Sequence, residues 1–490
     1  MCIFSRRLSE ILVYFLVLNY SYTPCLAAFK GKIMSQFPNG TVDLDGVSIE
    51  SWLVMFDKKG RCENPASRDA LLVRLRELDK KTPVILFSHG WNNGYREAVA
   101  KYTNFLREFE VLHKSQKAAP GFENKPIFVG IVWPSIWFSL DDPPTAKVDS
   151  SLSQDSNAAD EFLKEGIAIN LIDLEERSRF QELYLRSELN EGESLEFADL
   201  AAKAIAYDIS TGASEGAEAG LPDGQAILSA AIDLQSNKIV VYNDDGSAQT
   251  SGLFSALDPR NLARVASVYQ MKDRAGVVGR IGVSMLLSGM LKNTSFPLYL
   301  IGHSFGAKVV LGGVAGQPLP RKITSILLMQ PAISHLCFAR KISGRHGPGA
   351  YWTTLSEDRV INPLYLTYSK ADRPLHDLYH LALRRSQDLG DVKVFSSNKP
   401  SASIGCAGNT SAGDPPSKYC ALGGYGPRDV DEGYCLVKEF PSPEGKFTEP
   451  KGVRVVGFDG SLSNKIVAHG DVFKKDTAWL LCYLIQNANN

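Results

Sequence analysis

The stretch Pro297-Leu-Tyr-Leu-Ile-Gly-His-Ser-Phe-Gly-Ala-Lys-Val-Val-Leu311 joins an apolar strand, a glycine-flanked serine and an apolar helix. A serine hydroxyl is a weak nucleophile unless its oxygen is exposed and directed at a base. A tight turn from strand to helix exposes that oxygen, and glycines two residues to either side let neighbouring backbone approach closely. The N-terminus of the following helix would also favour a developing negative charge. The pattern therefore predicts Ser304 as a nucleophile at the carboxyl end of a buried strand.

A second stretch, Val84-Ile-Leu-Phe-Ser-His-Gly-Trp-Asn-Asn-Gly94, ends another apolar strand with a His-Gly pair. Together the two stretches resemble the α/β-hydrolase superfamily, and the His-Gly-Trp-Asn form looks like a branch of lipase- and esterase-like proteins. The resemblance covers roughly residues 80–135 and 260–490. It implies that the backbone N–H groups of Trp91 and Phe305 form an oxyanion hole. It also implies a structural role for His89, which would hold the loop by hydrogen bonds.

The resemblance further implies a base and an orienting carboxylate that follow the serine in the order acid, then histidine. His469 fits the base, because it follows the last expected strand and precedes the last expected helix. Asp372 fits the acid, because it follows the second strand beyond the nucleophile. Asp377 is the alternative acid, and Arg373 could instead pair with Asp372 at the surface. We expect Asp471 in the first turn of the final helix, where a carboxylate favours the helix dipole.

The remaining histidines after the nucleophile suggest no further chemistry. His335 and His346 precede the expected acid-bearing strand and are poor candidates for the base. His376 and His380 are four residues apart, so they could share a helix face as a metal pair. Two histidines alone make an incomplete site, and surface or capping roles are the simpler interpretation. The sequence therefore predicts neither a metal nor a cofactor.

Short apolar runs alternate with segments of helical periodicity along most of the chain. Continuous rather than alternating apolar runs are typical of strands buried on both faces of a parallel sheet. The pattern predicts an α/β fold with a mostly parallel sheet flanked by helices, and the resemblance implies that this is an α/β-hydrolase sheet. Residues 41–57 could add one or two leading strands. The expected strands are Val84–Phe87, Ile127–Val132, Leu298–Ile301, Ile326–Met329, Leu364–Tyr368 and Val453–Val456, and the expected helices include Arg96–Leu112, Val265–Leu291, Val472–Ile485 and one from Ala307 onward.

Residues 137–259 interrupt this alternation of strands and helices. Between Asp141 and Asp223 the sequence holds 20 acidic residues against 6 basic ones. Amphipathic helices are expected near Ala159–Leu185 and Leu195–Tyr207. We interpret the segment as an acidic insertion over the carboxyl edge of the sheet, where a lid or cap would lie. A solvated acidic excursion remote from the site is the alternative.

The N-terminal 28 residues have the features of an export signal. Arg6 and Arg7 precede an apolar run, Ile11–Leu18, and small residues near Ala27 suit a signal peptidase. The run is shorter than the roughly 20 residues of a membrane span, although a retained N-terminal anchor is the alternative. We therefore expect an exported chain, periplasmic or secreted, with a hydrolase domain at residues 29–490 and no membrane span after cleavage.

Composition and cysteine content agree with such a protein. The 490 residues are 44% hydrophobic and 22% charged, with a formal net charge of −1, so nothing suggests a nucleic-acid partner. Six cysteines would remain after signal cleavage, an even number that permits disulfides. Cys406, Cys420 and Cys435 lie together in a Gly/Ser/Pro-rich stretch, although their pairing cannot be deduced from the sequence.

These features predict a serine hydrolase that acts through an acyl-enzyme. Its substrate would be a carboxylic ester, a lipid or a thioester. Peptide substrates also remain open, and aromatic residues near the site are as consistent with core packing as with an apolar substrate. One alternative is an acyltransferase that uses the same three residues. The other is a non-catalytic binding protein that kept the fold.

Overall fold

A computed structural model describes residues 40–91, 93–116, 119–135, 167–168, 170–171, 173–208, 222–239, 257–342, 347–382, 406, 410–442, 451–462 and 464–489. The expected signal peptide, residues 1–28, lies outside this part of the chain, as do residues 136–166 and His346. The N-terminal half of the acidic segment is therefore mostly outside the described residues.

The described residues contain one eight-stranded sheet in the order β1-β3-β2-β4-β5-β6-β8-β7. Every neighbouring pair runs parallel. The general α/β class expected from the sequence is thus confirmed. The strands are β1 (Glu50–Met55), β2 (Val84–Ser88), β3 (Ile127–Val132), β4 (Leu298–His303), β5 (Ser325–Met329), β6 (Leu364–Tyr368), β7 (Cys435–Lys438) and β8 (Val455–Asp459).

Each face of the sheet has its own hydrophobic core, because successive side chains of a strand point to opposite faces. In β2, Val84 and Leu86 join one core, whereas Ile85 and Phe87 join the other. All four are fully buried. This two-sided burial explains why the strand reads as an uninterrupted apolar run.

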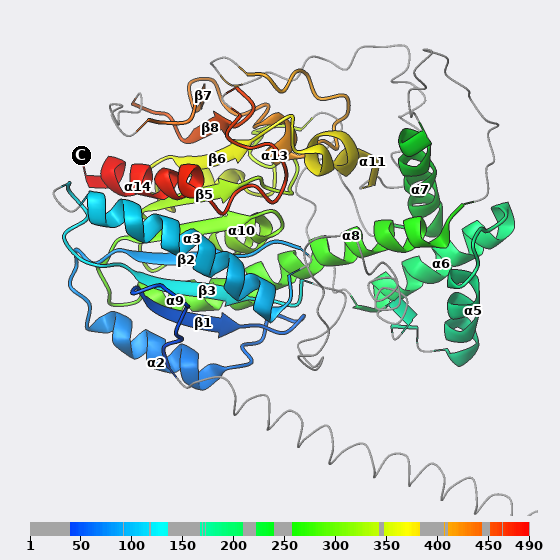
Figure 1. Cartoon of the computed structure of the whole chain (residues 1–490), viewed down its shortest axis with the longest axis horizontal. Helices are drawn as coiled ribbons and strands as arrows, with labels where there is room; N and C mark the ends of the chain where they lie inside the picture. Colours follow the sequence, from blue (N-terminus) through cyan, green and yellow to red (C-terminus); the bar gives the residue numbers. More distant parts are fainter. Residues whose placement is uncertain are drawn as a thin grey trace, which may run out of the picture.

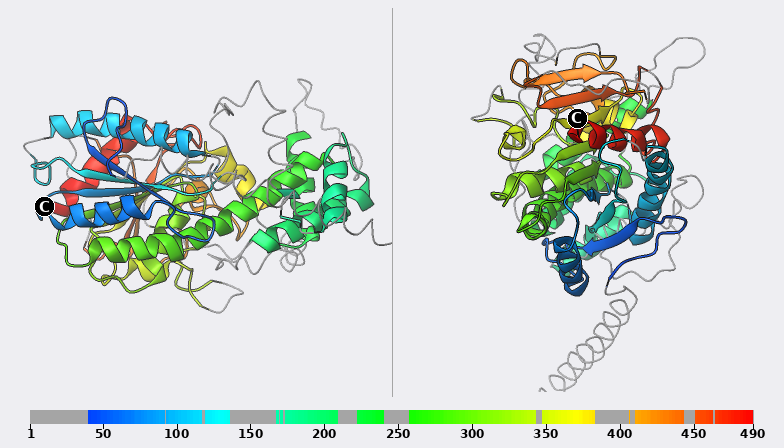
Figure 2. Two further views of the ribbon diagram at one scale, coloured as in Figure 1. Left: turned by 90° about the horizontal axis from the view of Figure 1, so that it is seen from below. Right: turned by 90° about the vertical axis from the view of Figure 1, so that its left-hand side faces the viewer.

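Helices cover both faces of the sheet (Figures 1 and 2). Helices α3 and α14 pack together on one face, and α2, α9 and α10 contribute to the core on the other. The described helices are α2 (Pro65–Arg76), α3 (Tyr95–Ser115), α5 (Leu174–Tyr184), α6 (Glu191–Asp208), α7 (Gly224–Ile239), α8 (Pro259–Val277), α9 (Ser284–Leu291), α10 (Gly306–Gly316), α11 (Tyr379–Ala382), α13 (Leu422–Tyr425) and α14 (Lys475–Asn489), with π-helical turns η1 (Val278–Val283) and η3 (Pro374–Leu378) and a 3-10 turn η2 (Trp352–Leu355).

Helices α5, α6 and α7 form a separate helical module beyond the carboxyl ends of the strands (Figure 1). Helix α8 connects this module to the body of the molecule. It continues through η1 into α9, so that residues Pro259–Leu291 form one long rod (Figure 2). This run is long and apolar enough to cross a membrane, but 72% of its apolar window is buried inside the protein. The burial is that of a core helix.

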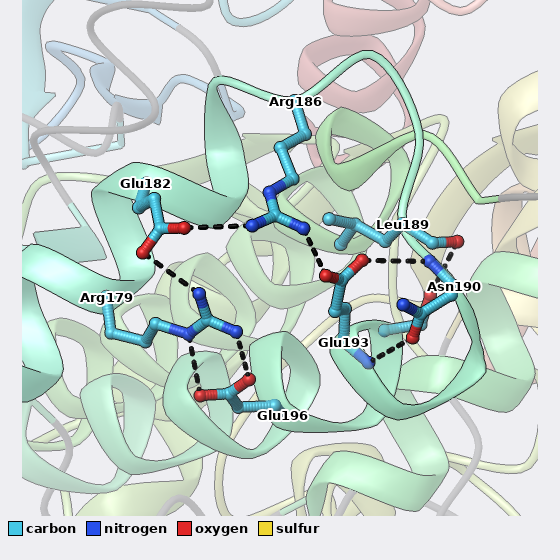
Figure 3. Close-up of polar contacts among 8 residues, drawn as sticks. Arg179, Glu182, Arg186, Leu189, Asn190, Glu193 and Glu196 are labelled. Carbon is cyan, nitrogen blue, oxygen red and sulfur yellow. Dashed lines mark hydrogen bonds and ion pairs between the residues drawn. The ribbon is translucent and has the colours of Figure 1, made fainter.

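The surface of the helical module carries a connected set of ion pairs (Figure 3). Arg179 contacts Glu196 through two hydrogen bonds of 2.9 and 2.8 Å and also contacts Glu182 at 2.9 Å. Arg186 continues the network by bonding Glu182 at 2.9 Å and Glu193. Exposed pairs contribute little individually, so the network chiefly fixes how α5 lies against α6.

Helix α6 begins with a capping box, a reciprocal pair of hydrogen bonds at a helix N-terminus. The Asn190 side chain accepts from the Glu193 N–H at 3.0 Å, and the Glu193 carboxylate accepts from the Asn190 N–H at 3.1 Å. One residue earlier, Leu189 exchanges two backbone hydrogen bonds with Leu257, directly before α8. The module is therefore tied to the start of the long rod.

The sequence-based boundaries were right for most elements and wrong for a few. The last expected strand lies at Val455–Asp459 rather than Val453–Val456, and the short edge strand β7 was not expected. Helix α14 begins at Lys475, so Asp471 is not in its first turn as expected. Instead, Asp471 precedes the helix and accepts from the Val467 N–H at 3.2 Å and the Lys474 ammonium at 2.6 Å.

Two of the three clustered cysteines are joined. Cys406 and Cys435 form a disulfide, with their Cα atoms 5.0 Å apart, and it attaches the chain before β7 to the first residue of that strand. Cys420 is buried and does not belong to this disulfide. A short edge strand is held by few hydrogen bonds, so this cross-link adds an anchor at the margin of the sheet.

Candidate active site

The turn that carries Ser304 is held in a conformation that few residues adopt. Ser304 lies between β4 and α10 with φ of 55°, in the left-handed region. A non-glycine residue there costs about 1–3 kcal/mol, and such strain is found mainly at functional sites. The backbone is held by bonds from the Ser304 N–H to the Met329 carbonyl and from the Ala332 N–H to the Ser304 carbonyl, both at 3.1 Å.

Two glycines, one in the turn and one in the loop after β2, are required by close contacts. A Cβ on Gly302 would lie 2.7 Å from the Cα of Ala307. A Cβ on Gly90, at the end of β2, would lie 2.5 Å from the Cβ of Ser304. The His-Gly pair after β2 and the serine turn after β4 are therefore in direct contact, as their positions on adjacent parallel strands predict.

The three residues proposed for catalysis come together in one hydrogen-bonded chain. The Ser304 hydroxyl donates to Nε2 of His469 at 2.9 Å, and Nδ1 of His469 donates to Oδ2 of Asp372 at 2.8 Å. Ser304 follows β4, Asp372 follows β6, and His469 lies between β8 and α14. Because these strands are parallel, all three residues emerge at the same edge of the sheet.

The carboxylate of Asp372 is completely buried, whereas the His469 side chain is 26% exposed. Oδ1 of Asp372 accepts from the Leu375 N–H at 3.2 Å. The buried anion thus has donors on both oxygens, which a carboxylate removed from water needs. Asp377, the alternative acid, instead contacts Arg373 and Nδ1 of its neighbour His376. Among the described residues, only Asp372 is bonded to His469 in this way.

One residue of this network was missed in the sequence. Gln330 follows β5 directly, is fully buried and has φ of 44°. Its side-chain Nε2 donates to Oδ2 of Asp372 at 2.8 Å. The available signal was that Gln330 follows β5, the strand next to β4. A residue in that position lies at the same edge of the sheet as Ser304. Neutral glutamines are common at such positions, and so the sequence alone gave no reason to select it.

The loop after β2 is fixed by side chains around one carbonyl group. The Gly90 carbonyl accepts from Nδ1 of His89 at 2.9 Å and from Nδ2 of Asn93 at 2.8 Å. Asn93 Nδ2 also donates to the Trp91 carbonyl at 2.7 Å. Since the Gly90 carbonyl and the Trp91 N–H belong to the same planar peptide, fixing one fixes the direction of the other.

The two residues that carry the expected oxyanion donors have neighbouring side chains. The rings of Trp91 and Phe305 have centroids 6.5 Å apart, and Trp91 is 37% exposed while Phe305 is buried. The hydrogen bonds found among the described residues include none donated by the backbone N–H of Trp91 or Phe305. Within the described residues, neither N–H group is therefore committed to another backbone acceptor.

His89 is a buried neutral residue that orders this loop. Burial lowers the pKa of His89 to about 4. Its ring stacks on Trp133 with centroids 5.6 Å apart, and its Nε2 accepts from the Trp133 N–H at 3.3 Å. In a neutral imidazole with the proton on Nδ1, Nδ1 donates to the Gly90 carbonyl and Nε2 accepts from the Trp133 N–H, so both hydrogen bonds are satisfied. The structural role expected for His89 agrees with these contacts.

His303 is a second buried histidine beside the site. Its Nε2 donates to the His469 carbonyl at 3.2 Å, and the two rings have centroids 5.1 Å apart. Burial, followed by the neighbouring charge of His469, lowers the pKa of His303 well below its ordinary value. A neutral His303 can hold the loop that carries His469 without adding positive charge next to it.

The other histidines of the described chain have structural partners. His335 donates from Nδ1 to the Cys420 carbonyl at 2.8 Å. His376 stacks on Tyr425 with centroids 4.3 Å apart and contacts the Ala412 carbonyl through Nε2 at 3.2 Å. Among the described residues, no group of three or more His, Cys, Asp or Glu side chains could hold a metal ion.

No family model, curated protein or solved structure matches this chain. The arrangement of the residues themselves is therefore the guide to the chemistry of the site.

Proposed function

We propose that this protein is a serine hydrolase of the α/β-hydrolase type that cleaves esters through an acyl-enzyme. The observation that carries the proposal is the chain from Ser304 Oγ through His469 to Asp372, with hydrogen bonds of 2.9 and 2.8 Å. A serine in a left-handed turn, bonded to a histidine that is bonded to a buried carboxylate, is the arrangement that activates a hydroxyl.

The first half of the reaction forms the acyl-enzyme. His469 Nε2 removes the proton of Ser304 as Oγ attacks the ester carbonyl carbon. Asp372 keeps the proton of His469 on Nδ1 and stabilises the imidazolium that forms. The tetrahedral intermediate collapses when His469 gives the proton to the departing alkoxide, which leaves as an alcohol.

The second half restores the enzyme. Water attacks the acyl carbon while His469 takes one of its protons, and the proton returns to Ser304 as the carboxylic acid leaves. In both halves the N–H groups of Trp91 and Phe305 would hold the oxyanion. One such donor contributes about 3–4 kcal/mol in comparable sites. The N-terminus of α10, directly after Phe305, favours the same negative charge.

Two features support the finer architecture in this proposal. The nucleophile, acid and base follow β4, β6 and β8, the chain order of this superfamily. The module of α5, α6 and α7 lies beyond the carboxyl ends of the strands, where a cap over the site would lie (Figure 1). We include in the proposal that the module is this cap and that the protein is exported. The Cys406–Cys435 disulfide supports an oxidising compartment.

Labelling with a fluorescent fluorophosphonate tests the proposal, because this reagent reacts only with an activated serine. The wild type should become labelled, whereas Ser304→Ala and His469→Ala should not. Ser115→Ala, at the end of α3, is the matched control and should label like the wild type. A folded wild-type protein that stays unlabelled in all conditions would contradict the proposal and favour a binding protein.

A second measurement separates hydrolysis from acyl transfer. The wild type is incubated with p-nitrophenyl esters of increasing chain length, with and without added alcohols or amines, and the acyl products are identified. Free acid as the main product supports a hydrolase. An acylated acceptor as the main product, with the same dependence on Ser304, would instead identify an acyltransferase.

A further inference from the structure

Gln330 extends the hydrogen-bonded chain of the proposed active site by one residue. Its Nε2 donates to Oδ2 of Asp372 at 2.8 Å, and this same oxygen accepts the Nδ1 proton of His469. The series of hydrogen bonds therefore runs from Ser304 through His469 and Asp372 to Gln330. Gln330 is fully buried, so no water competes for these bonds.

The surroundings of Gln330 fix which way its amide points. The backbone N–H of Gln330 donates to the Thr367 hydroxyl at 3.0 Å, which leaves the hydroxyl proton for Oε1 of Gln330, also at 3.0 Å. On the other side, Nε2 faces two acceptors, Asp372 and the Gly423 carbonyl at 3.2 Å. A flipped amide would bring oxygen against two acceptors, so Nε2 must face Asp372.

The backbone at Gln330 is also held in place at a cost. Its φ of 44° lies in the left-handed region, which a non-glycine residue adopts only when its surroundings determine it. The preceding residue, Met329, accepts the Ser304 N–H through its carbonyl at 3.1 Å. Gln330 thus follows β5 at a point next to Ser304, and its side chain points toward Asp372.

We propose that Gln330 is a positioning residue that orients Asp372 and partly neutralises its charge. This inference rests on the proposed function. A neutral donor on Oδ2 stabilises the carboxylate without adding charge, and it holds the oxygen in line with Nδ1 of His469. Nδ1 of His469 is then held against the carboxylate, and Nε2 is aligned with Ser304.

Other charged or titratable groups lie beside His469 or its neighbour His303 and must stay constant in any test. They come from β4, α3, the loop after β6 and the segment that His469 itself occupies. These groups are His303, Ser304, Lys101, Asp372, Asp471 and Lys474. A substitution at Gln330 changes none of them directly.

The test compares Gln330→Met with Gln486→Met in the full chain, using p-nitrophenyl acetate and butyrate. Gln486 is a matched control because it is another buried glutamine, bonded to Gln116 at 3.0 Å and away from the site. Gln330→Met should lower kcat about 10- to 100-fold, the effect of losing a hydrogen bond to a charged group, with KM changed less than about twofold.

The pH profile separates positioning from a merely structural effect. Without the amide, Oδ2 of Asp372 carries more negative charge and stabilises protonated His469, so the acid limb of kcat/KM should move to higher pH. Gln330→Glu keeps the side-chain size and the Thr367 contact but adds a second carboxyl group, and it should move the limb in the same direction. An unchanged limb in both variants would overturn the inference.

A spectroscopic measurement decides the point without turnover. The His469 Nδ1 proton bonded to Asp372 should give a downfield proton resonance that shifts in Gln330→Met and stays in place in Gln486→Met. If the wild type neither labels with fluorophosphonate nor hydrolyses esters, the proposed function fails, yet this shift would still support the positioning role. An identical resonance in all variants would reject it.

Discussion

Gly306 lies so close to the end of β2 that a Cβ there would be 2.1 Å from the Ser88 carbonyl oxygen. This oxygen belongs to the backbone, which cannot rotate away as a flexible side chain can. The glycine after Ser304 therefore fixes the distance between the serine turn and the loop that carries Trp91.

Gly306→Ala should consequently both destabilise the protein and lower its labelling by fluorophosphonate. The added methyl group must displace the serine turn from β2, and overpacking of this kind costs about 1–3 kcal/mol. Melting temperature and labelling rate measure the two effects. Gly192→Ala in α6, where the nearest atom would be 3.6 Å from the new Cβ, should leave labelling unchanged and should not lower the melting temperature, because a helix favours alanine over glycine. Equal behaviour of the two variants would show that the contact is unimportant.

Asp372→Asn and Asp377→Asn distinguish the two candidate acids. An asparagine at residue 372 keeps the shape but favours the wrong tautomer of His469, a change that lowers kcat about 10⁴-fold in comparable triads. Asp377→Asn affects an ion pair with Arg373 and should change kcat less than about twofold. Steady-state kinetics on one ester give both values. A larger loss for Asp377→Asn would reverse the assignment.

Asn93→Asp tests how the Trp91 N–H is directed. The carboxylate cannot donate to the Gly90 and Trp91 carbonyls, so the peptide between them loses its main restraint. We expect kcat to fall by about 10- to 1,000-fold, the range for a disturbed or lost oxyanion donor, with little change in KM. Asn124→Asp, whose amide contacts Thr82, is the control. A selective rise in KM would indicate a role in substrate binding instead.

His89 should make the folded protein less stable in acid. Its pKa falls from 6.5 to about 4 on burial, so the unfolded chain binds a proton between these values that the folded chain does not. The contribution of neutral His89 to the free energy of unfolding is therefore fully present above about pH 6.5. It is lost as the pH falls toward 4, and the loss for this residue is about 3 kcal/mol. Urea unfolding at several pH values measures the slope, which should be shallower in His89→Gln. Burial also lowers the pKa of His303, so part of the loss of stability in acid should remain in the His89→Gln variant.

The sequence pointed to the three residues that the structure joins by hydrogen bonds, because each of them follows a local pattern. Ser304 stands in a strand-turn-helix motif, Asp372 follows a buried strand, and His469 precedes the final helix. Gln330 and Asn93 could not be selected in the same way, because their importance comes from contacts in the folded chain. Gln330, for example, bonds to residues 42 and 93 positions away.

Structural details were missed where local patterns are weak or alike. The edge strand β7 is four residues long and only partly buried, so it has no apolar run to reveal it. The π-helical turn Val278–Val283 was not visible, because its apolar spacing continues that of the helices on either side. Asp471 was placed in the final helix because a carboxylate in a first turn is common, whereas the chain winds through turns up to Lys475.

The rod Pro259–Leu291 belongs to the helical module at one end and to the core beneath the sheet at the other. Its π-helical turn packs tightly against α10, since a Cβ on Gly279 would lie 2.5 Å from the Val309 carbonyl oxygen. Neither the helical module nor the core can therefore unfold without removing a surface against which the other packs. Differential scanning calorimetry should therefore record a single cooperative transition for the whole chain, and two separate heat peaks would show that the module unfolds independently.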